Sequence, residues 1–146
     1  MNKIILCGFL ALAFACKQKD ASADKSSSAD KTVTLANGEF KDLPINEFLK
    51  TYQDAALNHE AILLDVRTPP EFNDGYIPGA ITINFLDEDF DKQIDMLDKS
   101  KKYFVYCQQG ARSSKALVKM KQMGFDKVYN LVGGYAAYLM ATSQQK

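Results

Sequence analysis

A cysteine and an arginine separated by four residues form the pair whose types and spacing point most directly to chemistry in this 146-residue chain. Cys107 follows the β-rich stretch Tyr103–Tyr106, and four loop residues lead to Arg112, which precedes a helical pattern. Backbone N–H groups in such a loop can converge and bind an anion. A helix N-terminus and a fixed positive charge also favour a thiolate over a thiol. The loop therefore predicts a nucleophilic or sulfur-carrying cysteine.

The residues of this loop have separate expected roles. N–H groups from Gln108 to Ser113 are expected to form the anion cradle, and Gly110 lets the chain curl because it has no Cβ. Arg112 either supplies two donors to an oxyanion such as thiosulfate or stays directed at the sulfur. Ser113 and Ser114 are expected to cap the free amides of the helix that they open.

A histidine is not expected to activate the cysteine. His59 is the single histidine of the chain, and it precedes the strand predicted to begin at Ala61. Cys107, in contrast, follows the carboxyl end of its strand. In a parallel sheet these positions lie at opposite edges, most of a strand length apart. Backbone amides and Arg112 must then activate Cys107.

Strands and helices are predicted to alternate along the chain. Apolar runs are typical of strands buried on both faces, and apolar residues three or four apart are typical of helices. Strands are predicted at 32–35, 61–66, 80–85, 103–106 and 127–132, and helices at 46–57, 69–72, 90–97, 113–123 and 135–140. This order predicts an α/β fold, with an open, mainly parallel sheet of about five strands and helices on both faces.

Ligands bind such sheets beyond the carboxyl ends of the strands, where loops begin at Asp65, Asn84, Cys107 and Gly133. Most polar residues at this edge have a structural interpretation. Arg67 is expected to pair with Glu71 and lock the intervening turn, while Asp65 fixes loop amides.

Glycine has a separate expected role beside the cysteine. Gly133 and Gly134 are expected to let the last helix pack against the cysteine loop.

The side chains of Gln108 and Gln109 are expected to lie on the loop exterior, where they influence the choice of acceptor.

The beginning of the chain has the pattern of a secretory signal. Lys3 precedes the apolar run Ile4–Ala15, which is too short for a comfortable bilayer span. The segment Ala13-Phe14-Ala15-Cys16 resembles a bacterial lipobox, which implies cleavage before Cys16 and lipidation of its sulfur. A lipid would anchor the protein to a membrane without spanning it. Secretion without lipid is the alternative, because Phe14 is unusual at its position.

The predicted organisation has three parts: a signal peptide at 1–15, a lipidated cysteine with a flexible tether at 16–31, and one folded domain at 32–146. The tether is rich in Lys, Asp, Ser and Ala, a composition that does not build a core. The expected location is periplasmic, after export across the inner membrane, with the domain lipid-anchored to a membrane.

Cysteine usage follows from this organisation. Cys7 leaves with the signal peptide and Cys16 carries lipid, so Cys107 is the one free thiol in an oxidising compartment. That leaves no internal disulfide and no cysteine-rich metal site in the mature protein, and it indicates a function for the thiol. The formal net charge of zero, without a basic stripe, argues against nucleic acid as a partner.

Several segments follow one another in a recognisable order. They are Leu64-Asp-Val-Arg67, Glu71-Phe72, Gly75-Tyr-Ile-Pro-Gly-Ala80, Asn84, Cys107-Gln-Gln-Gly-Ala-Arg-Ser113 and Leu131-Val-Gly-Gly134. Together they resemble the single-domain rhodaneses, proteins like thiosulfate sulfurtransferase, over most of the folded region. The resemblance implies a rhodanese-like fold. It also implies that Cys107 accepts a sulfane sulfur from a small donor such as thiosulfate and passes it from a persulfide to cyanide or a thiol.

The resemblance also implies the composition of the site. Cys107 is the catalytic residue, and no metal or organic cofactor is implied. The donor and the persulfide are expected to be bound by Gln108, Gln109, Gly110, Ala111, Arg112 and Ser113. The domain is expected to act as a monomer.

Two other functions remain open. Cysteine phosphatases also place a thiolate in a loop that ends in arginine, but with five intervening residues, and they need a general acid such as one from Asp87-Glu-Asp89. A solvated acidic loop is the favoured interpretation of that cluster. Rhodanese-like domains can also serve as sulfur carriers or interaction modules without turnover, although the presence of both Cys107 and Arg112 favours catalysis.

Overall fold

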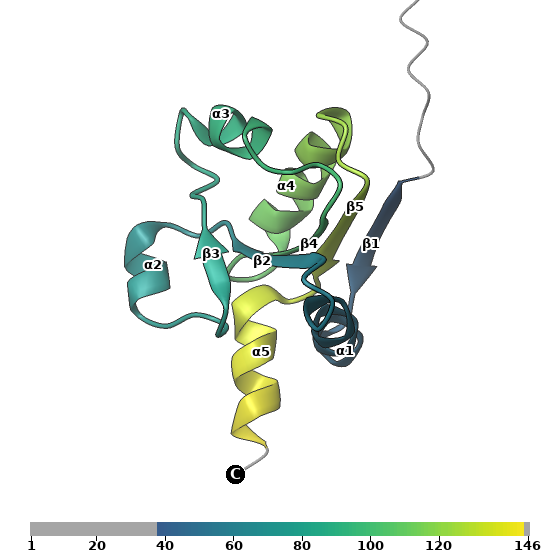
Figure 1. Ribbon diagram of the computed structural model, residues 1–146. Coiled ribbons are helices and arrows are strands. Elements are labelled where there is room, and N and C mark those ends of the chain that lie inside the picture. Colours follow the sequence, from purple (N-terminus) through teal and green to yellow (C-terminus); the bar gives the residue numbers. More distant parts are fainter. Residues whose placement is uncertain (1–37, 145–146) are drawn as a thin grey trace, which may run out of the picture. The chain divides into compact units, whose positions relative to one another are not determined.

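The described part of the protein, residues 38–144 of a computed structural model, is built on a five-stranded sheet (Figure 1). All four neighbouring strand pairs are parallel, and the strand order is β1-β5-β4-β2-β3. The strands are β1 Glu39–Leu43, β2 Ala61–Asp65, β3 Ala80–Thr82, β4 Lys102–Tyr106 and β5 Lys127–Leu131. The predicted open parallel sheet is confirmed.

Helices cover both faces of this sheet, as the alternation of elements predicts (Figure 1). On one face lie α1 (Ile45–Ala56) and α5 (Gly134–Ser143), and on the other lie α3 (Phe90–Asp95) and α4 (Ala111–Gln122). The short α2 (Pro69–Asn73) connects β2 to β3. Two apolar layers therefore enclose the sheet, and the loops at its edges are left to build a site.

Strand β4 supplies the centre of both layers because successive side chains point to opposite faces. Tyr103 and Val105 pack into the layer under α4, whereas Phe104 and Tyr106 pack into the layer under α1. The ring of Phe104 meets Phe48 and Tyr52 edge-on, each at 5.4 Å, and stacks on Tyr129 at 4.8 Å between centroids. This buried strand fixes the start of the loop that follows it.

The edge strand of the described domain is not among the predicted strands. The predicted strand at 32–35 lies outside the described residues, as do the predicted signal peptide, Cys16 and the tether. The observed edge strand is β1, which pairs in register with β5 from Glu39 opposite Lys127 to Leu43 opposite Leu131. Its sequence, Glu-Phe-Lys-Asp-Leu, is too polar to signal a strand. Pairing with β5, rather than its own pattern, places it in the sheet.

Several other boundaries differ from the predicted ones, and two of them have a clear physical cause. β3 ends at Thr82 rather than Phe85 because its partner β2 ends at Asp65, although the Ile83 N–H still donates to the Asp65 carbonyl at 3.0 Å. α4 begins at Ala111, two residues before the predicted start, because Gly110 takes a left-handed φ of 95° and turns the chain at once into the helix.

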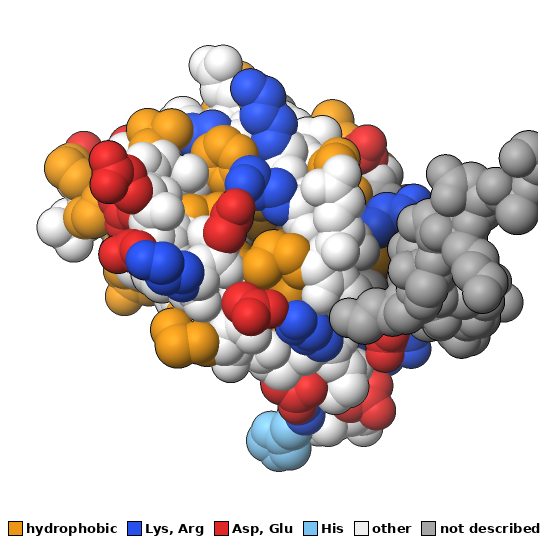
Figure 2. All heavy atoms as spheres, turned by 90° about the horizontal axis from the view of Figure 1, so that it is seen from above, with side chains coloured by type: hydrophobic (Ala, Val, Ile, Leu, Met, Phe, Trp, Pro, Cys, Tyr) orange, Lys and Arg blue, Asp and Glu red, His pale blue; other side chains and the backbone are white. Residues whose placement is uncertain are grey.

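The surface of the described domain is mixed in charge on the side drawn in Figure 2. Acidic and basic side chains are interspersed there. Exposed ion pairs of the described domain include Lys119 with Asp91 and Lys92 with Asp89. Within residues 38–144, no helix is both long and apolar enough to cross a membrane.

The aromatic cluster around Phe104 yields a stability prediction. Because Phe104 has 0% of its surface exposed, Phe104→Ala leaves a cavity and is expected to lower the free energy of unfolding by about 3–5 kcal/mol. Urea denaturation measures this change. The control is Val118→Ala on α4, where the side chain is 50% exposed and the expected change is within about 0.5 kcal/mol. Equal losses in the two variants would contradict the assigned core.

Candidate active site

The predicted site residues meet at the carboxyl edge of the sheet. Cys107 directly follows β4, Asp65 ends β2, and Gly133 lies two residues beyond β5. His59 is exposed in the turn between α1 and β2, at the opposite edge. The predicted position of His59 at the edge away from Cys107 is therefore confirmed.

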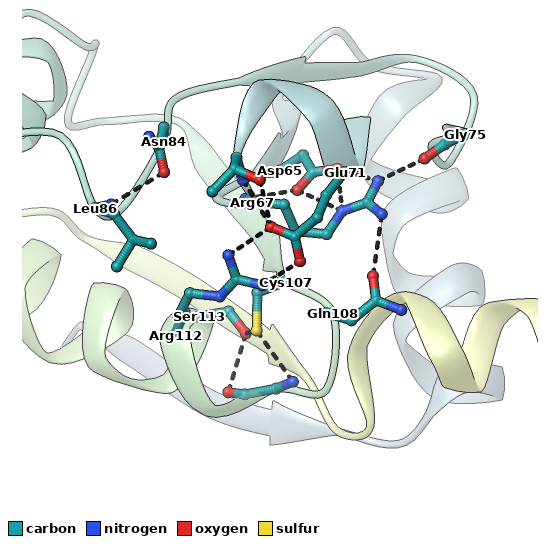
Figure 3. A network of polar contacts seen from close by, with 12 residues as sticks. Asp65, Arg67, Glu71, Gly75, Asn84, Leu86, Cys107, Gln108, Arg112 and Ser113 are labelled. Atoms are coloured by element: carbon teal, nitrogen blue, oxygen red, sulfur yellow. Dashed lines mark hydrogen bonds and ion pairs between the residues drawn. The ribbon is translucent and has the colours of Figure 1, made fainter. Parts of the chain in front are cut away.

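The segment Cys107–Arg112, here called the cysteine loop, curls around the sulfur (Figure 3). The Gly110 N–H donates to Cys107 Sγ at 3.1 Å, and Ser113 Oγ lies 3.5 Å from the same sulfur. Cys107 is 1% exposed and Ser113 is fully buried. The sulfur thus lies at the floor of the loop, facing donors from both the loop and the first turn of α4.

These donors decide the ionisation of the thiol. Burial raises the pKa of Cys107, but hydrogen bonds from the Ser113 hydroxyl and from the amides of Ser113, Gln109 and Gly110 lower it. The net pKa lies below the ordinary value for cysteine. Since the thiolate is the nucleophilic form, this supports the predicted reactive cysteine. The inward-facing amides have the arrangement that the sequence predicts for an anion cradle.

Helix α5 holds the loop in this orientation by binding its carbonyl groups. The Tyr135 N–H donates to the Cys107 carbonyl at 2.7 Å, and the Ala136 N–H donates to the Gln108 carbonyl at 3.1 Å. A Cβ on Gly134 would overlap the Cys107 carbonyl oxygen, and Gly134 also has a positive φ of 57°. The expected close approach of the last helix, made possible by glycine, is therefore confirmed.

Arg112 forms an ion pair with Glu71, so both of its terminal nitrogens are already hydrogen-bonded. Its Nη1 and Nη2 donate to the two carboxylate oxygens of Glu71 at 2.8 and 2.5 Å (Figure 3). Hydrogen bonding from Arg112 is the main cause that lowers the pKa of Glu71 to about 2, against a smaller opposing effect of burial. The pKa of Arg112 is raised, first by Glu71 and also by its proximity to Cys107. Arg112 therefore lies between the sulfur and a carboxylate.

The predicted pair of Arg67 with Glu71 is wrong. Arg67 is buried, and its Nη2 donates to Asp65 Oδ2 at 2.7 Å and to the Gly75 carbonyl at 2.6 Å. Its guanidinium carbon also lies 4.1 Å from the centre of the Tyr135 ring. Burial selects these partners, because a guanidinium removed from water needs a buried carboxylate and Asp65 is fully buried. The expected role of Asp65 is confirmed for one loop amide, the Arg67 N–H at 2.9 Å.

Arg67 also reaches the cysteine loop. Its Nη1 donates to the side-chain oxygen of Gln108 at 3.2 Å, so Gln108 is part-buried rather than external as predicted, whereas Gln109 is exposed. The Ser113 hydroxyl is also not the predicted helix cap. It lies 3.1 Å from the Gly110 carbonyl, and Gly110 occupies the N-cap position without a side-chain cap. Both differences bind the loop more firmly to the domain.

A cavity of about 280 Å³ opens onto the cysteine. It is lined by Glu71, Cys107, Gln108, Gln109, Ala111 and Arg112. Five of these are predicted site residues, while Gly110 and Ser113 contact the sulfur from behind. Glu71 is the residue that the sequence analysis did not place in the site. Its position three residues after Thr68 is a capping-box signal, and that box is present, but it does not reveal the contact with Arg112.

Other polar groups have structural roles. A larger hollow of about 540 Å³ lies where β1, β4 and β5 begin, far along the sheet from Cys107, and no cysteine lines it. Asp87 and Asp89 are exposed and bind Asn84 and Lys92, as the solvated-loop interpretation predicts. Within residues 38–144, no group of three or more His, Cys, Asp or Glu side chains is arranged to hold a metal ion.

The Ser113 contact predicts how the thiol titrates. Ser113→Ala removes a donor to the sulfur, so the pKa of Cys107 should rise and alkylation by iodoacetamide at neutral pH should become several-fold slower. The rate measured against pH gives the midpoint, which is expected to move to higher pH.

Ser114→Ala is the matched control, because Ser114 lies one position along α4 and makes no hydrogen bond to the sulfur among the described residues. An unchanged midpoint in Ser113→Ala, with thermal melts showing a folded protein, would remove Ser113 from the activation of the thiol.

Comparison with known proteins places these features in a family. The model of the rhodanese-like domain matches residues 45–141. "Thiosulfate sulfurtransferase 16, chloroplastic" from Arabidopsis thaliana is 38% identical over 85 residues, which are 51% of this chain and 71% of that protein. "Thiosulfate sulfurtransferase GlpE" from Shewanella oneidensis is 30% identical over 99 residues, which are 68% of this chain and 92% of that protein.

Solved structures agree on the fold. A rhodanese-related protein from Thermoplasma volcanium superimposes with a TM-score of 0.58 at 25% identity, covering 69% of this chain and 92% of that one. Further relatives are tRNA uridine(34) hydroxylases, such as one from Enterobacter that is 31% identical over 107 residues. The chain spans 31% of the length of that relative.

Proposed function

This chain belongs to the rhodanese-like domain family, and we propose that it is a sulfurtransferase that carries a sulfane sulfur as a persulfide on Cys107. One observation carries the proposal. The Cys107 sulfur lies at the floor of an open cavity and receives hydrogen bonds from Gly110 and Ser113, with a lowered pKa. Such a sulfur is both a nucleophile and the anchor of a stabilised anion.

The reaction consists of two displacements at sulfur. In the first, the Cys107 thiolate attacks the sulfane sulfur of the donor, the donor's S–S bond breaks, and the leaving group departs with the electron pair. With thiosulfate the leaving group is sulfite. In the second, a thiolate or cyanide attacks the outer sulfur of the persulfide, and Cys107 leaves as the thiolate. Electrons balance over the two steps, so no external oxidant or reductant is required.

The surroundings of the sulfur suit this cycle. Cys107 must be a good nucleophile in the first step and a good leaving group in the second, and a lowered pKa favours the leaving group. Amides from Gln109, Gly110 and Ser113 that stabilise the thiolate also suit a persulfide anion at the same place. No proton has to be moved by a histidine, in agreement with the position of His59.

The site offers less support for phosphatase chemistry. An alcohol leaving group needs a protonated acid near the thiolate. Among the described residues, Glu71 is the one carboxylate that lines the cavity, and its pKa of about 2 keeps it ionised at neutral pH. Asp87 and Asp89 are exposed and paired elsewhere. The four-residue spacing between Cys107 and Arg112 also argues against a phosphatase.

The central test is persulfide formation. Wild-type protein treated with thiosulfate or an alkyl persulfide is expected to gain the mass of one sulfur at Cys107, and cyanide should remove it. Cys107→Ser should lose the mass gain and all transfer activity, because a hydroxyl does not form the persulfide. Its thermal melt should stay near that of the wild type, since the exchange is nearly isosteric. Wild-type rates of transfer in Cys107→Ser would refute the proposal.

The same experiment separates an enzyme from a carrier. A persulfide that forms on Cys107 and passes to cyanide or a thiol over many cycles identifies an enzyme. A persulfide that forms on Cys107 and is passed on only slowly, without sustained turnover, identifies a carrier.

We also propose that the domain is exported and held at a membrane by lipid on Cys16, which lies outside the described residues. The apolar run 4–15 and the small residues before Cys16 support this proposal. The wild type is expected in the membrane fraction with an N-terminal mass that includes acyl chains. Cys16→Ser should appear in the soluble fraction without them. A wild-type protein that begins at Met1, without lipid, would contradict the proposal.

A further inference from the structure

We propose that Glu71 selects the sulfur donor by charge, and that it favours an organic persulfide over the thiosulfate dianion. This inference rests on the proposed function, because it concerns the first transfer to Cys107. It assigns a specificity role to a residue that makes no bond to the reacting sulfur atoms.

Glu71 is fixed at the cavity from two sides. Helix α2 brings it there, and Thr68 holds it, since the Thr68 hydroxyl and N–H both donate to Glu71 Oε2 at 2.7 and 3.0 Å. Arg112, from α4, holds both carboxylate oxygens. The Glu71 side chain is still 30% exposed and lines the same cavity as Cys107. A donor that enters this cavity therefore meets the carboxylate.

The pair also occupies part of the group that would bind an oxyanion. Each terminal nitrogen of Arg112 already donates one N–H to Glu71, so the end-on fork of the guanidinium is not available to thiosulfate. The amide of Gly110 and the hydroxyl of Ser113 contact the sulfur at the cavity floor. A sulfonate group further out would have to displace Glu71 from Arg112 or bind beside it.

The net charge at the cavity also disfavours thiosulfate as the donor. Ionised Glu71 cancels the positive charge of Arg112. The Cys107 thiolate then gives the site one net negative charge. The buried pair of Arg67 with Asp65 adds no net charge. Thiosulfate brings two negative charges, whereas an alkyl persulfide presents its sulfane sulfur as a neutral or singly charged group. Electrostatic repulsion in a partly screened cavity therefore disfavours thiosulfate more strongly than an alkyl persulfide.

The favoured transfer is balanced without a further reactant. The Cys107 thiolate attacks the terminal sulfur of R–S–SH, a new S–S bond forms, and the donor S–S bond breaks. The electron pair leaves with R–S⁻, and the proton stays on the new persulfide or is lost to water. The product thiolate carries no sulfonate, so its departure does not depend on Arg112.

The experiment compares two donors in two variants. Wild type and Glu71→Gln are assayed for kcat/KM with thiosulfate and with freshly generated cysteine persulfide, using the same acceptor. Gln keeps an oxygen for the Thr68 N–H but removes the charge and releases part of the Arg112 fork. We expect kcat/KM for thiosulfate to rise about tenfold, and that for cysteine persulfide to rise by no more than about threefold, because a singly charged donor feels about half the electrostatic free energy.

Glu60→Gln is the matched control. Glu60 pairs with Lys102 at the opposite edge of the sheet, so this change removes the same charge from the molecule without altering the cavity. The ratio of the two kcat/KM values should stay at the wild-type level in Glu60→Gln. The rise in Glu71→Gln should also shrink at high salt, because it is electrostatic.

The results of this experiment distinguish a failure of the donor-selection inference from a failure of the proposed function. If wild type forms the Cys107 persulfide but Glu71→Gln leaves the donor ratio unchanged, Glu71 does not select the donor and the sulfurtransferase stands. If neither donor places sulfur on Cys107 in the wild type, the proposed function itself fails. Should Glu71→Gln not fold, raising the salt concentration with wild type must favour thiosulfate relative to cysteine persulfide; an unchanged ratio would overturn the inference.

Discussion

The chemistry of this domain depends on one arrangement, in which α5 binds the outward carbonyls of the cysteine loop. A peptide unit that turns its carbonyl toward Tyr135 and Ala136 directs the neighbouring N–H groups inward. Those inward groups meet the Cys107 sulfur. Without the contact made possible by Gly134, a loop of this length would lose the orientation that gathers its amides. The surroundings that lower the pKa of the Cys107 thiol are thus set mainly by the orientation of the backbone.

Two arginines with different surroundings complete the site. Arg67 is buried and has a structural role, because its hydrogen bonds connect the end of β2, the turn at Gly75 and the side chain of Gln108. Arg112 is partly exposed and serves the cavity, where it faces both the sulfur and Glu71. The same residue type therefore has a structural role in one place and an electrostatic role in the other, and burial decides which.

Much of the fold could be predicted because its signals are local. The apolar strands around Leu64 and Phe104 and the helical spacing before Met120 read directly from the sequence. β1 could not be predicted, because its polar sequence becomes a strand only through pairing with β5. The start of α4 was missed for a related reason, since it depends on the left-handed turn at Gly110.

The sequence by itself determined that Cys107 and Arg112 lie at the two ends of one short loop, because only four residues separate them. It also determined that His59 would lie at the other edge, because that follows from strand direction alone. Only the tertiary structure decided which carboxylate each arginine binds. Asp65, Glu71, Arg67 and Arg112 come from separate segments, and their pairing depends on burial and on the packing of α2 beside α4, neither of which is encoded in local spacing.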